Sequence, residues 1–311
     1  MTQDFYNNKK SSKSILSIIV LSILYIIIAK VGMTLFSLKP TNITLFWLPA
    51  GLALIMYIKY KQVALPFIIV ASFVANYSGM QLDNTASSII HTTVASIIDG
   101  FAPYLGYVFM RFFKIDELDD YKSLSLFLCF VCILPSLVAG LLLTQNMVWG
   151  GYITSGEMFN MMINISFSDT VGMLLVYGIY SEMLSADQAT NRSISENFNA
   201  LIATSLLSLL LVWVAYEIFS LAILLIPVLL SVLAFKRLYV DLPLAQLAVI
   251  CFILIMSILH MGPFESDNYY DSILLMMLFI FACNVCTNYM VIYCKVSDKK
   301  NNDKGNSIDI P

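Results

Sequence analysis

Long apolar segments occupy most of this chain, and they constrain its fold more than any other feature. A helix needs about 20 mostly apolar residues to cross a hydrocarbon core about 30 Å thick. Because backbone inside a bilayer must satisfy its own hydrogen bonds, such segments predict an all-α, polytopic transmembrane bundle. We expect about ten spans, with eight or nine as the alternatives. The candidate spans are residues 14–36, 43–58, 62–80, 87–111, 123–146, 158–180, 199–216, 219–235, 242–260 and 271–294.

The composition excludes an ordinary water-soluble domain. Hydrophobic residues make up 59% of the 311 residues and charged residues 12%, whereas soluble domains have roughly 45–50% and 25%. A net charge of −3 indicates no nucleic-acid-binding surface. The lysine-rich start followed by an apolar run resembles a signal peptide, but the run is too long for one and no small-residue cleavage site follows. We therefore expect a retained first helix.

Basic residues give an independent prediction of topology, because cytoplasmic loops are enriched in Lys and Arg. Residues 200–235 would span about 54 Å as one helix, which suits a hairpin turning at Glu217 better than a single crossing. With that hairpin and the N-terminus inside, only Lys39 falls outside, and Lys30 lies within the first span. The expected cytoplasmic residues are Lys9, Lys10, Lys13, Lys59, Lys61, Arg111, Lys114, Lys122, Arg192, Lys236, Arg237, Lys295, Lys299, Lys300 and Lys304.

The same division gives the expected domain organisation. Residues 1–13 form a cytoplasmic N-terminal tail, 14–294 a membrane domain, and 295–311 a polar cytoplasmic tail. The sequence has no phosphate-cradling glycine loop and no nucleotide-binding fingerprint. Its two histidines, His91 and His260, fall in or beside spans. We expect a protein that is not an enzyme and has no cofactor.

Two acids in the apolar segments are the most informative single residues. Asp99 and Asp169 lie near the middle of their predicted spans, where a carboxylate costs at least about 2.5–3.5 kcal/mol and is by default a functional candidate. One interpretation is a ligand or proton site, and the other is a hydrogen-bonded acid that holds helices together. Lys30 lies about 9 Å below the outer end of the first span. It either snorkels to the interface or turns inward toward one of the aspartates.

Cysteines and prolines give weaker signals. Two C-x-x-C spacings, Cys129/Cys132 and Cys283/Cys286, place thiols on one helix face, but in apolar sequence cysteine behaves as a small hydrophobe, so we expect no metal site. Prolines inside predicted spans are expected to kink their helices, and Gly172 to allow close helix approach. These prolines are Pro49, Pro66, Pro103, Pro135 and Pro227.

Five short elements resemble, in order and spacing, those of the MASE1 family of bacterial integral-membrane sensory domains. Trp47-Leu-Pro49-Ala-Gly51 is similar to the W-P-A-A-G element of that family, and Pro66–Asn76 to its proline-to-asparagine third helix. Ser168-Asp169-Thr-Val-Gly172 resembles its G-D-x-x-G element, with Ser168 in place of glycine. The others are Asp99 to Arg111 and Leu134–Ala139, and the strongest match covers residues 20–185.

The resemblance implies a sensory role in a bacterial inner (cytoplasmic) membrane. MASE1 domains are typically N-terminal inputs to histidine kinases, diguanylate cyclases or phosphodiesterases, so a chain without an output domain implies a separate signalling partner or a membrane transporter as partner. Lys30, Trp47, Asn76, Asp99 and Asp169 are then the candidate polar or ligand-binding residues for an unknown small ligand. A proton-coupled or small-molecule transporter and a structural or assembly subunit remain the alternatives.

Overall fold

The computed structural model describes residues 2–38, 43–188, 194–235, 241–260 and 262–306, and these are almost entirely helical. The chain divides into two compact units. Unit 1 comprises Met1–Phe109 and Phe130–Met173, and unit 2 comprises Met110–Cys129 and Leu174–Pro311. Each unit has its own packed interior and is treated separately below.

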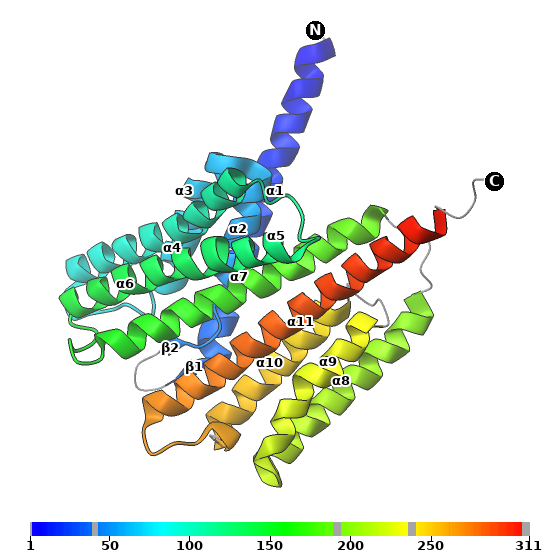
Figure 1. Ribbon diagram of the computed structural model, residues 1–311. Coiled ribbons are helices and arrows are strands. Elements are labelled where there is room, and N and C mark those ends of the chain that lie inside the picture. The colour runs from blue at the N-terminus through cyan, green and yellow to red at the C-terminus, as the bar shows by residue number, and fades with distance from the viewer. Residues whose placement is uncertain (1, 39–42, 189–193, 236–240, 261, 307–311) are drawn as a thin grey trace. The chain divides into compact units, whose positions relative to one another are not determined.

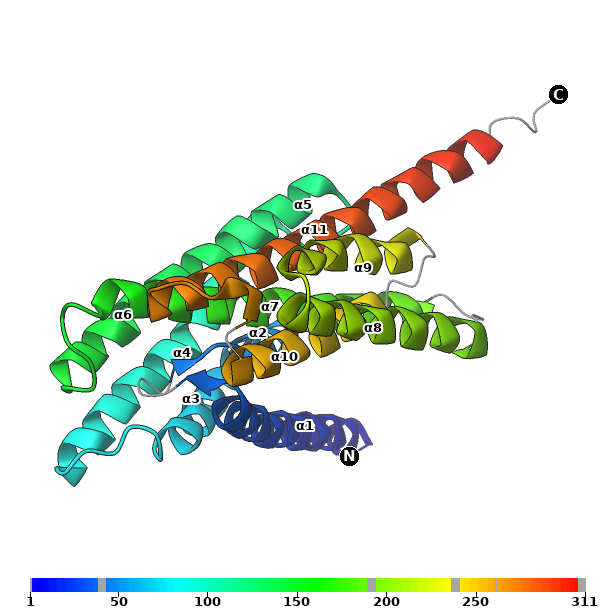
Figure 2. The same ribbon diagram turned by 90° about the horizontal axis from the view of Figure 1, so that it is seen from below.

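Unit 1 begins with a long helix followed by a short strand pair and two short helices. Helix α1 (Thr2–Leu35) leads into β1 (Ser37–Leu38), which pairs antiparallel with β2 (Ile43–Thr44) (Figure 2). Helices α2 (Leu48–Tyr60) and α3 (Ala64–Asn76) follow, and both pack against α1. The strand pair reverses the chain after α1, so that α2 starts beside the C-terminal end of α1.

The chain reverses direction between α2 and α3. Lys61 has a positive φ of 55°, which ends α2 before a single 3-10 turn. Before α2, the carbonyl of Phe46 lies beside Gly32 of α1, and after α3, Ser78 accepts a hydrogen bond from Lys30 of α1. Because both ends of the α2–α3 segment lie beside the same part of α1, these helices form a hairpin. Its turn is the basic turn predicted between the second and third apolar segments.

The remaining helices of unit 1 pack through small residues. Helix α4 (Thr85–Phe113) is followed by one helical run made of α5 (Tyr121–Leu126), a π-helical segment (Phe127–Ile133) and α6 (Leu134–Trp149), and then by α7 (Met158–Gln188) (Figure 1). Of these, α5 and the C-terminal parts of α4 and α7 belong to unit 2. A Cβ at Gly140 of α6 would collide with Ser166 of α7, and one at Gly106 of α4 would lie 2.8 Å from the carbonyl oxygen of Val131. Glycine therefore sets how closely these helices approach.

The prolines are placed differently from the expectation of five kinked helices. Pro103 lies inside α4, and Pro135 lies two residues after the π-helical segment, so both are placed within a continuous helical run, where a proline is expected to cause a kink. Pro49 and Pro66 instead lie in the first turns of α2 and α3, where a missing N–H is tolerated. The kinks expected at those two positions are therefore wrong. Pro227 is likewise the second residue of its helix.

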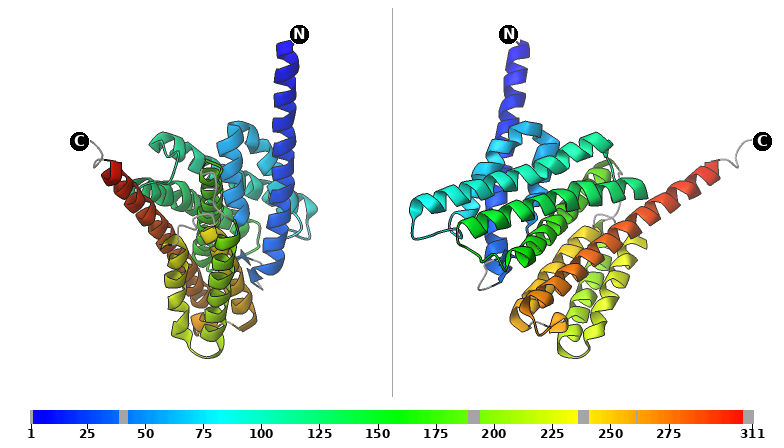
Figure 3. Two further views of the ribbon diagram at one scale, coloured as in Figure 1. Left: turned by 90° about the vertical axis from the view of Figure 1, so that its right-hand side faces the viewer. Right: turned by 60° about the vertical axis from the view of Figure 1, so that its left-hand side comes forward.

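Unit 2 is a helical bundle built on a second hairpin (Figure 3). Helix α8 (Ile194–Glu217) turns through a 3-10 segment (Ser220–Leu225) into α9 (Ile226–Phe235), and the two helices pack against each other. Helix α10 (Asp241–His260) packs on α8, and α11 (Tyr269–Asn306) packs on α9. The hairpin turn predicted at Glu217 is confirmed by the end of α8 at that residue.

By length and composition, seven helices of the described chain can cross a membrane, which makes this a multi-pass membrane protein. They are Ile15–Leu35, Leu48–Asn76, Thr85–Phe113, Tyr121–Trp149, Met158–Met183, Leu242–Leu259 and Tyr270–Ser297. The predicted ten are not reached, because the α2–α3 hairpin counts once and two helices, Ile202–Glu217 and Ser220–Phe235, are shorter.

Helix ends also differ from the predicted segment boundaries. Residues 2–13 belong to α1, residues 181–188 to α7 and residues 295–306 to α11, so these parts of the expected tails and connector are helical. Polar residues can extend a helix beyond its apolar stretch, and hydropathy alone does not mark where such a helix ends. Lys39, Lys236 and Arg237, on which the predicted topology partly depends, lie outside the described residues.

Candidate functional site

Unit 1 contains an open cavity of about 510 Å³, within the size range of small-molecule sites. Its wall combines the end of α1, the residues that lead into α2, the end of α3, and parts of α4, α6 and α7. All five polar residues that the sequence singled out contribute to this wall: Lys30, Trp47, Asn76, Asp99 and Asp169. The structure thus brings together side chains that are up to 139 positions apart in sequence.

Asp99 is held in place by a polar pair on α3. Its Oδ2 accepts hydrogen bonds from Ser72 Oγ at 2.6 Å and from Asn76 Nδ2 at 2.9 Å. Asn76 also donates to Ser72 at 3.0 Å, so the two α3 side chains reinforce each other one helical turn apart. Ser72, which is fully buried, was not singled out from the sequence. Asp99 is therefore oriented by α3 with one carboxylate oxygen already bonded.

Asp169 lies in the same wall in a contrasting environment. It is only 7% exposed, yet no hydrogen-bond or ion-pair partner for its carboxylate is found among the described residues. Its neighbour Ser168 donates to the carbonyl of Thr44 at 2.9 Å, which fixes this part of α7 against β2. Asp99 and Asp169 are close enough to repel each other electrostatically. The two acids thus place two carboxyl groups in a mostly buried region.

Lys30 reaches the cavity wall without pairing with either acid. Its Nζ donates to Ser78 Oγ at 2.5 Å, just after α3. This bond differs from the predicted pairing with an aspartate, whereas snorkelling of Lys30 toward the outer interface stays a prediction. The side chain still lines the cavity, so it supplies a positive charge opposite in sign to the two carboxylates.

The wall contains further polar residues that were not predicted from the sequence. Asn146 of α6 accepts from His91 Nδ1 at 2.8 Å, when that nitrogen carries the proton, and donates to the carbonyl of His91 at 3.0 Å. Tyr152 donates to the carbonyl of Met80 at 2.8 Å, and burial raises its pKa. A polar amide within an apolar segment was the one signal that could have identified Asn146.

Tyr25 of α1 is a buried neighbour of the acids that the sequence also left unmarked. Its ring is 1% exposed and packs in the core formed with α2 and α3. The hydroxyl lies within electrostatic range of Asp99 and Asp169, and it makes no well-formed hydrogen bond within the described parts of the chain. It adds a further polar group to the interior beside the cavity.

The glycine and proline candidates position this wall instead of lining it. Gly172 of α7 is buried, and a Cβ there would collide with the carbonyl of Trp47. The start of α2 therefore packs closely against α7 at Gly172, near Asp169. Pro49 lies in the first turn of α2. Gly51 is buried within α2.

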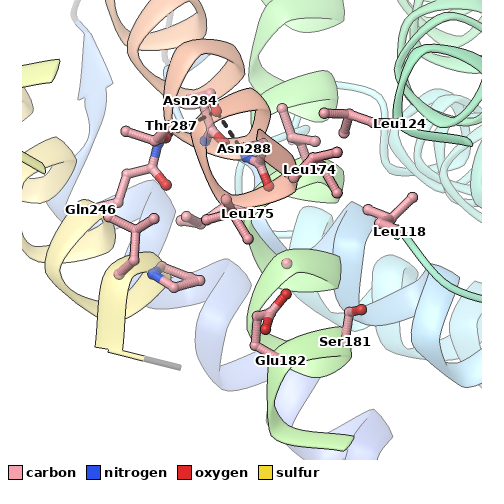
Figure 4. Close-up of a pocket in the computed structure, with 15 residues that line it drawn as sticks. Leu118, Leu124, Leu174, Leu175, Ser181, Glu182, Gln246, Asn284, Thr287 and Asn288 are labelled. Carbon is pink, nitrogen blue, oxygen red and sulfur yellow. Dashed lines mark hydrogen bonds between the residues drawn. The ribbon is translucent and has the colours of Figure 1, made fainter. Parts of the chain in front are cut away.

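Unit 2 contains a separate and much smaller polar centre (Figure 4). Its cavity of about 20 Å³ is large enough for a single water molecule. Glu182 of α7 forms an ion pair with Lys295 of α11 at 2.6 Å. Gln246 of α10 donates to Thr287 of α11 at 2.8 Å. This centre ties helices of unit 2 together and has no room for a larger ligand.

The same centre includes an unpartnered donor. Asn284 of α11 accepts a hydrogen bond from Asn288 at 3.0 Å. Its Nδ2 is buried and makes no bond to any described residue. Glu182 was not predicted as a site residue, because the sixth expected span ends at residue 180.

The cysteines give no sign of a metal centre in the described part of the chain. Cys132 and Cys283 are buried, and Cys129 and Cys286 are exposed. No group of three or more His, Cys, Asp or Glu side chains gathers there with a geometry for a metal ion. Burial of one thiol from each pair agrees with cysteine acting as a small apolar residue.

Comparison with known proteins extends the resemblance drawn from short motifs. The profile of the MASE1 family matches residues 16–296, nearly the whole chain. The match includes the helices of unit 2, which the motifs did not reach. No curated protein and no solved structure matches the chain. With its apolar helices and its polar cavity, the chain therefore belongs to the MASE1 family of membrane-associated sensory domains.

Proposed function

We propose that this protein senses a small polar ligand in the cavity of unit 1 and relays its binding to a separate signalling protein. The observation that carries the proposal is the cavity itself, because one Lys and two Asp side chains meet there within apolar helices. Intramembrane ionisable residues cost free energy and are retained mainly where they serve a function. Ligand binding changes a sensor only if two conformations bind the ligand with different affinity.

The construction of the wall supports such a difference in affinity. The cavity is formed by segments from six parts of unit 1, and Asp99 and Asp169 belong to different helices, α4 and α7. A ligand that contacts both acids would favour one spacing of these helices. A shift of α7 at the cavity would also move its C-terminal end, because α7 is one continuous helix to Gln188.

We further propose ten membrane crossings in a bacterial inner membrane, with both termini in the cytoplasm. The α2–α3 hairpin supports two crossings in place of one, and the α8–α9 hairpin supports two more. Lys59 and Lys61 are exposed at the α2–α3 turn, where the positive-inside rule places cytoplasmic basic residues. In this proposal residues 1–13 and 295–311 remain cytoplasmic tails and residues 14–294 the membrane domain. Parts of both tails are helical extensions of α1 and α11.

The proposed partner is a histidine kinase, a diguanylate cyclase or a phosphodiesterase. MASE1 domains are usually joined to such output domains, and here α11 continues as a polar helix to Asn306, beyond its apolar segment. The test is crosslinking in native membranes followed by purification of the tagged full-length chain and identification of bound proteins. Enrichment of one of these enzymes, at least several-fold over a tagged unrelated membrane protein, is the expected result.

A transport function predicts different behaviour in the same preparation. Purified chain in proteoliposomes would then accumulate a small molecule in response to a proton gradient. Uptake that is lost in Asp169→Asn, together with no enriched signalling enzyme, would overturn the sensor proposal. Loss of folding yield as the sole effect of Asp99→Asn and Asp169→Asn would instead indicate a structural subunit.

A further inference from the structure

We propose that the ligand of the unit 1 cavity is a small organic molecule bearing a primary or secondary ammonium group, which donates hydrogen bonds to Asp169. This inference rests on the proposed function, since it takes the cavity as the ligand site. It adds the chemical class of the ligand and the residue that selects it. Three properties of the wall lead to it: its charge, its unmatched hydrogen-bond acceptors, and its size.

The charge of the wall favours a cation. Its ionisable side chains include two carboxylates, Asp99 and Asp169, and one ammonium, Lys30. Lys30 is directed to Ser78, so its charge is not paired directly with either acid. Asp99 and Asp169 belong to the same wall, and a bound cation would favour the ionised form of both. Charges in a partly buried wall interact more strongly than in bulk water, so the wall favours a cation.

Three carboxylate oxygens of the wall are hydrogen-bond acceptors without a donor in the described part of the chain. Asp99 Oδ2 is bonded, but its Oδ1 and both oxygens of Asp169 have no donor among the described residues. Other polar groups of the wall already donate to main-chain carbonyls. These bonds run from Thr34 Oγ1 to Lys30, from Ser168 Oγ to Thr44, from Asn146 Nδ2 to His91, and from Tyr152 Oη to Met80.

A nearly buried carboxylate without a donor is unfavourable, and a ligand that supplies N–H groups relieves this cost. An ammonium group supplies both the charge and the donors, and charge-assisted hydrogen bonds of this kind are the strong ones. A quaternary ammonium supplies the charge alone. If charge alone determined binding, amines and quaternary ammonium ions would bind equally well. If hydrogen bonds to Asp169 contribute, as we propose, ligands with N–H groups bind more tightly.

Size and apolar surface make the ligand an organic molecule and not a bare metal ion. A cavity of about 510 Å³ far exceeds the volume of one ion or one water. Trp47 and Tyr152 contribute to the wall, and aromatic rings bind ammonium groups favourably. Met33, Leu143 and Met147 add apolar contact for the body of such a molecule.

The test compares molecules that differ only in their charged group. The full-length chain in lipid nanodiscs is titrated with a set of primary amines, for example tyramine and phenethylamine, and with the N,N,N-trimethyl derivative and the carboxylate counterpart of each. The measured quantity is the shift of the thermal unfolding midpoint at constant ionic strength. We expect stabilisation by primary amines, at least tenfold weaker apparent binding of the trimethyl derivatives, and no effect of the carboxylates.

Two variants assign the effect to the cavity. Asp169→Asn should weaken amine binding at least tenfold, whereas Asp116→Asn, in the exposed loop after α4, should leave it unchanged. Lys30→Met should strengthen amine binding about threefold or more, because it removes a like charge from the wall. The opposite sign expected for Lys30→Met keeps the test decisive if Asp169→Asn does not fold.

Several outcomes would overturn the inference while leaving the proposed function standing. These are stabilisation by the carboxylates, equal binding of amines and their trimethyl derivatives, or weaker amine binding in Lys30→Met. Absence of binding by every amine would also overturn it. The proposed sensory function is judged separately by co-purification with a signalling enzyme, which needs no added ligand, so the two can fail independently.

Discussion

At the residue scale, Gly172 makes the sharpest prediction because its missing Cβ is occupied by main-chain atoms. A Cβ at this position would fall on the carbonyl oxygen of Trp47 and within 3.2 Å of the Leu48 nitrogen. Backbone cannot move aside as a flexible side chain can, so Gly172→Ala should destabilise the protein by about 1–3 kcal/mol. Reversible unfolding in mixed micelles, followed by circular dichroism, measures this change.

Gly178, on the same helix, provides a matched control. A Cβ there would lie 3.8 Å from Asn288 Oδ1, which is ordinary van der Waals contact. Gly178→Ala should therefore be neutral or should stabilise α7 by about 0.5–1 kcal/mol, as alanine does within helices. Equal stability of the two variants would contradict the close contact between α7 and the start of α2.

The candidate residues show what sequence can indicate at this scale. A polar side chain inside an apolar segment is detectable, and all five polar candidates line one cavity for that reason. Their partners were not predictable in the same way. Ser72 and Tyr152 are ordinary residues in sequence, and only the packing of α3 on α4 and the loop after α6 brings them to the site.

At the element scale, the ion pair between Glu182 and Lys295 should stabilise the contact of α7 with α11 in unit 2. The two side chains are only 11% and 18% exposed and lie 2.6 Å apart. Lys295→Met leaves a poorly solvated carboxylate unpaired, so it should cost about 1.5–3 kcal/mol of unfolding free energy. Unfolding in mixed micelles measures it, with Lys122→Met, at an exposed position, as the control.

A double variant separates the pair from its two members. Replacing both side chains by apolar residues, in Glu182→Leu with Lys295→Met, should recover most of the lost stability, because no unpaired charge remains. The coupling free energy in the resulting cycle should then be well above about 0.5 kcal/mol. Strictly additive losses would show that the two residues act independently.

The start of α5 gives a pH-dependent prediction. Asp120 caps this helix, since its Oδ1 accepts from the Ser123 N–H at 2.7 Å. That bond holds the pKa of Asp120 below its usual value. The stabilisation should therefore be complete above the ordinary Asp pKa, about 3.9, and should disappear as the pH falls through the lower pKa of the folded state. Asp120→Ala should cost about 0.5–1 kcal/mol at pH 7.

The measurement is the stability difference between the parent chain and Asp120→Ala as a function of pH. It should be constant from pH 7 to about pH 5 and should shrink below about pH 4. Asp116→Ala, in the same loop but at a residue without a capping role in the structure, is the control. A difference that grows toward low pH would contradict the capping assignment.

Elements were predictable where hydropathy changes along the chain and were not predictable where it stays uniform. The turns near Lys61 and Glu217 follow from polar residues that interrupt apolar segments. The π-helical segment Phe127–Ile133 is apolar throughout, so its sequence carries no period that would distinguish it from an α-helix. Polar extensions such as residues 181–188 and 295–306 are helical although they lie beyond the apolar stretches, and a hydropathy window does not detect such helices.

At the scale of the whole molecule, the number of crossings decides on which side of the membrane each terminus lies. Seven crossings place the termini on opposite sides, whereas the ten that we propose return both to the cytoplasm. The two counts also predict different locations for the loops between the termini. If residues 48–76 cross once, the turn at Gln62 lies within the bilayer, and the loop before α7 faces the same side as the N-terminus.

Single cysteines in a background without the six native ones can test this arrangement. For ten crossings, a membrane-impermeant maleimide should label Thr2→Cys, Gln62→Cys and Lys300→Cys in inverted vesicles but not in intact cells. It should label Ser155→Cys in intact cells, which also serves as the positive control for outside access. Seven crossings predict labelling of Thr2→Cys and Lys300→Cys from opposite sides and protection of Gln62→Cys from both. Because the cavity wall includes residues that lead into α2, such as Trp47, and residues that follow α3, such as Ser78, the same result decides whether the cavity opens toward the outer face.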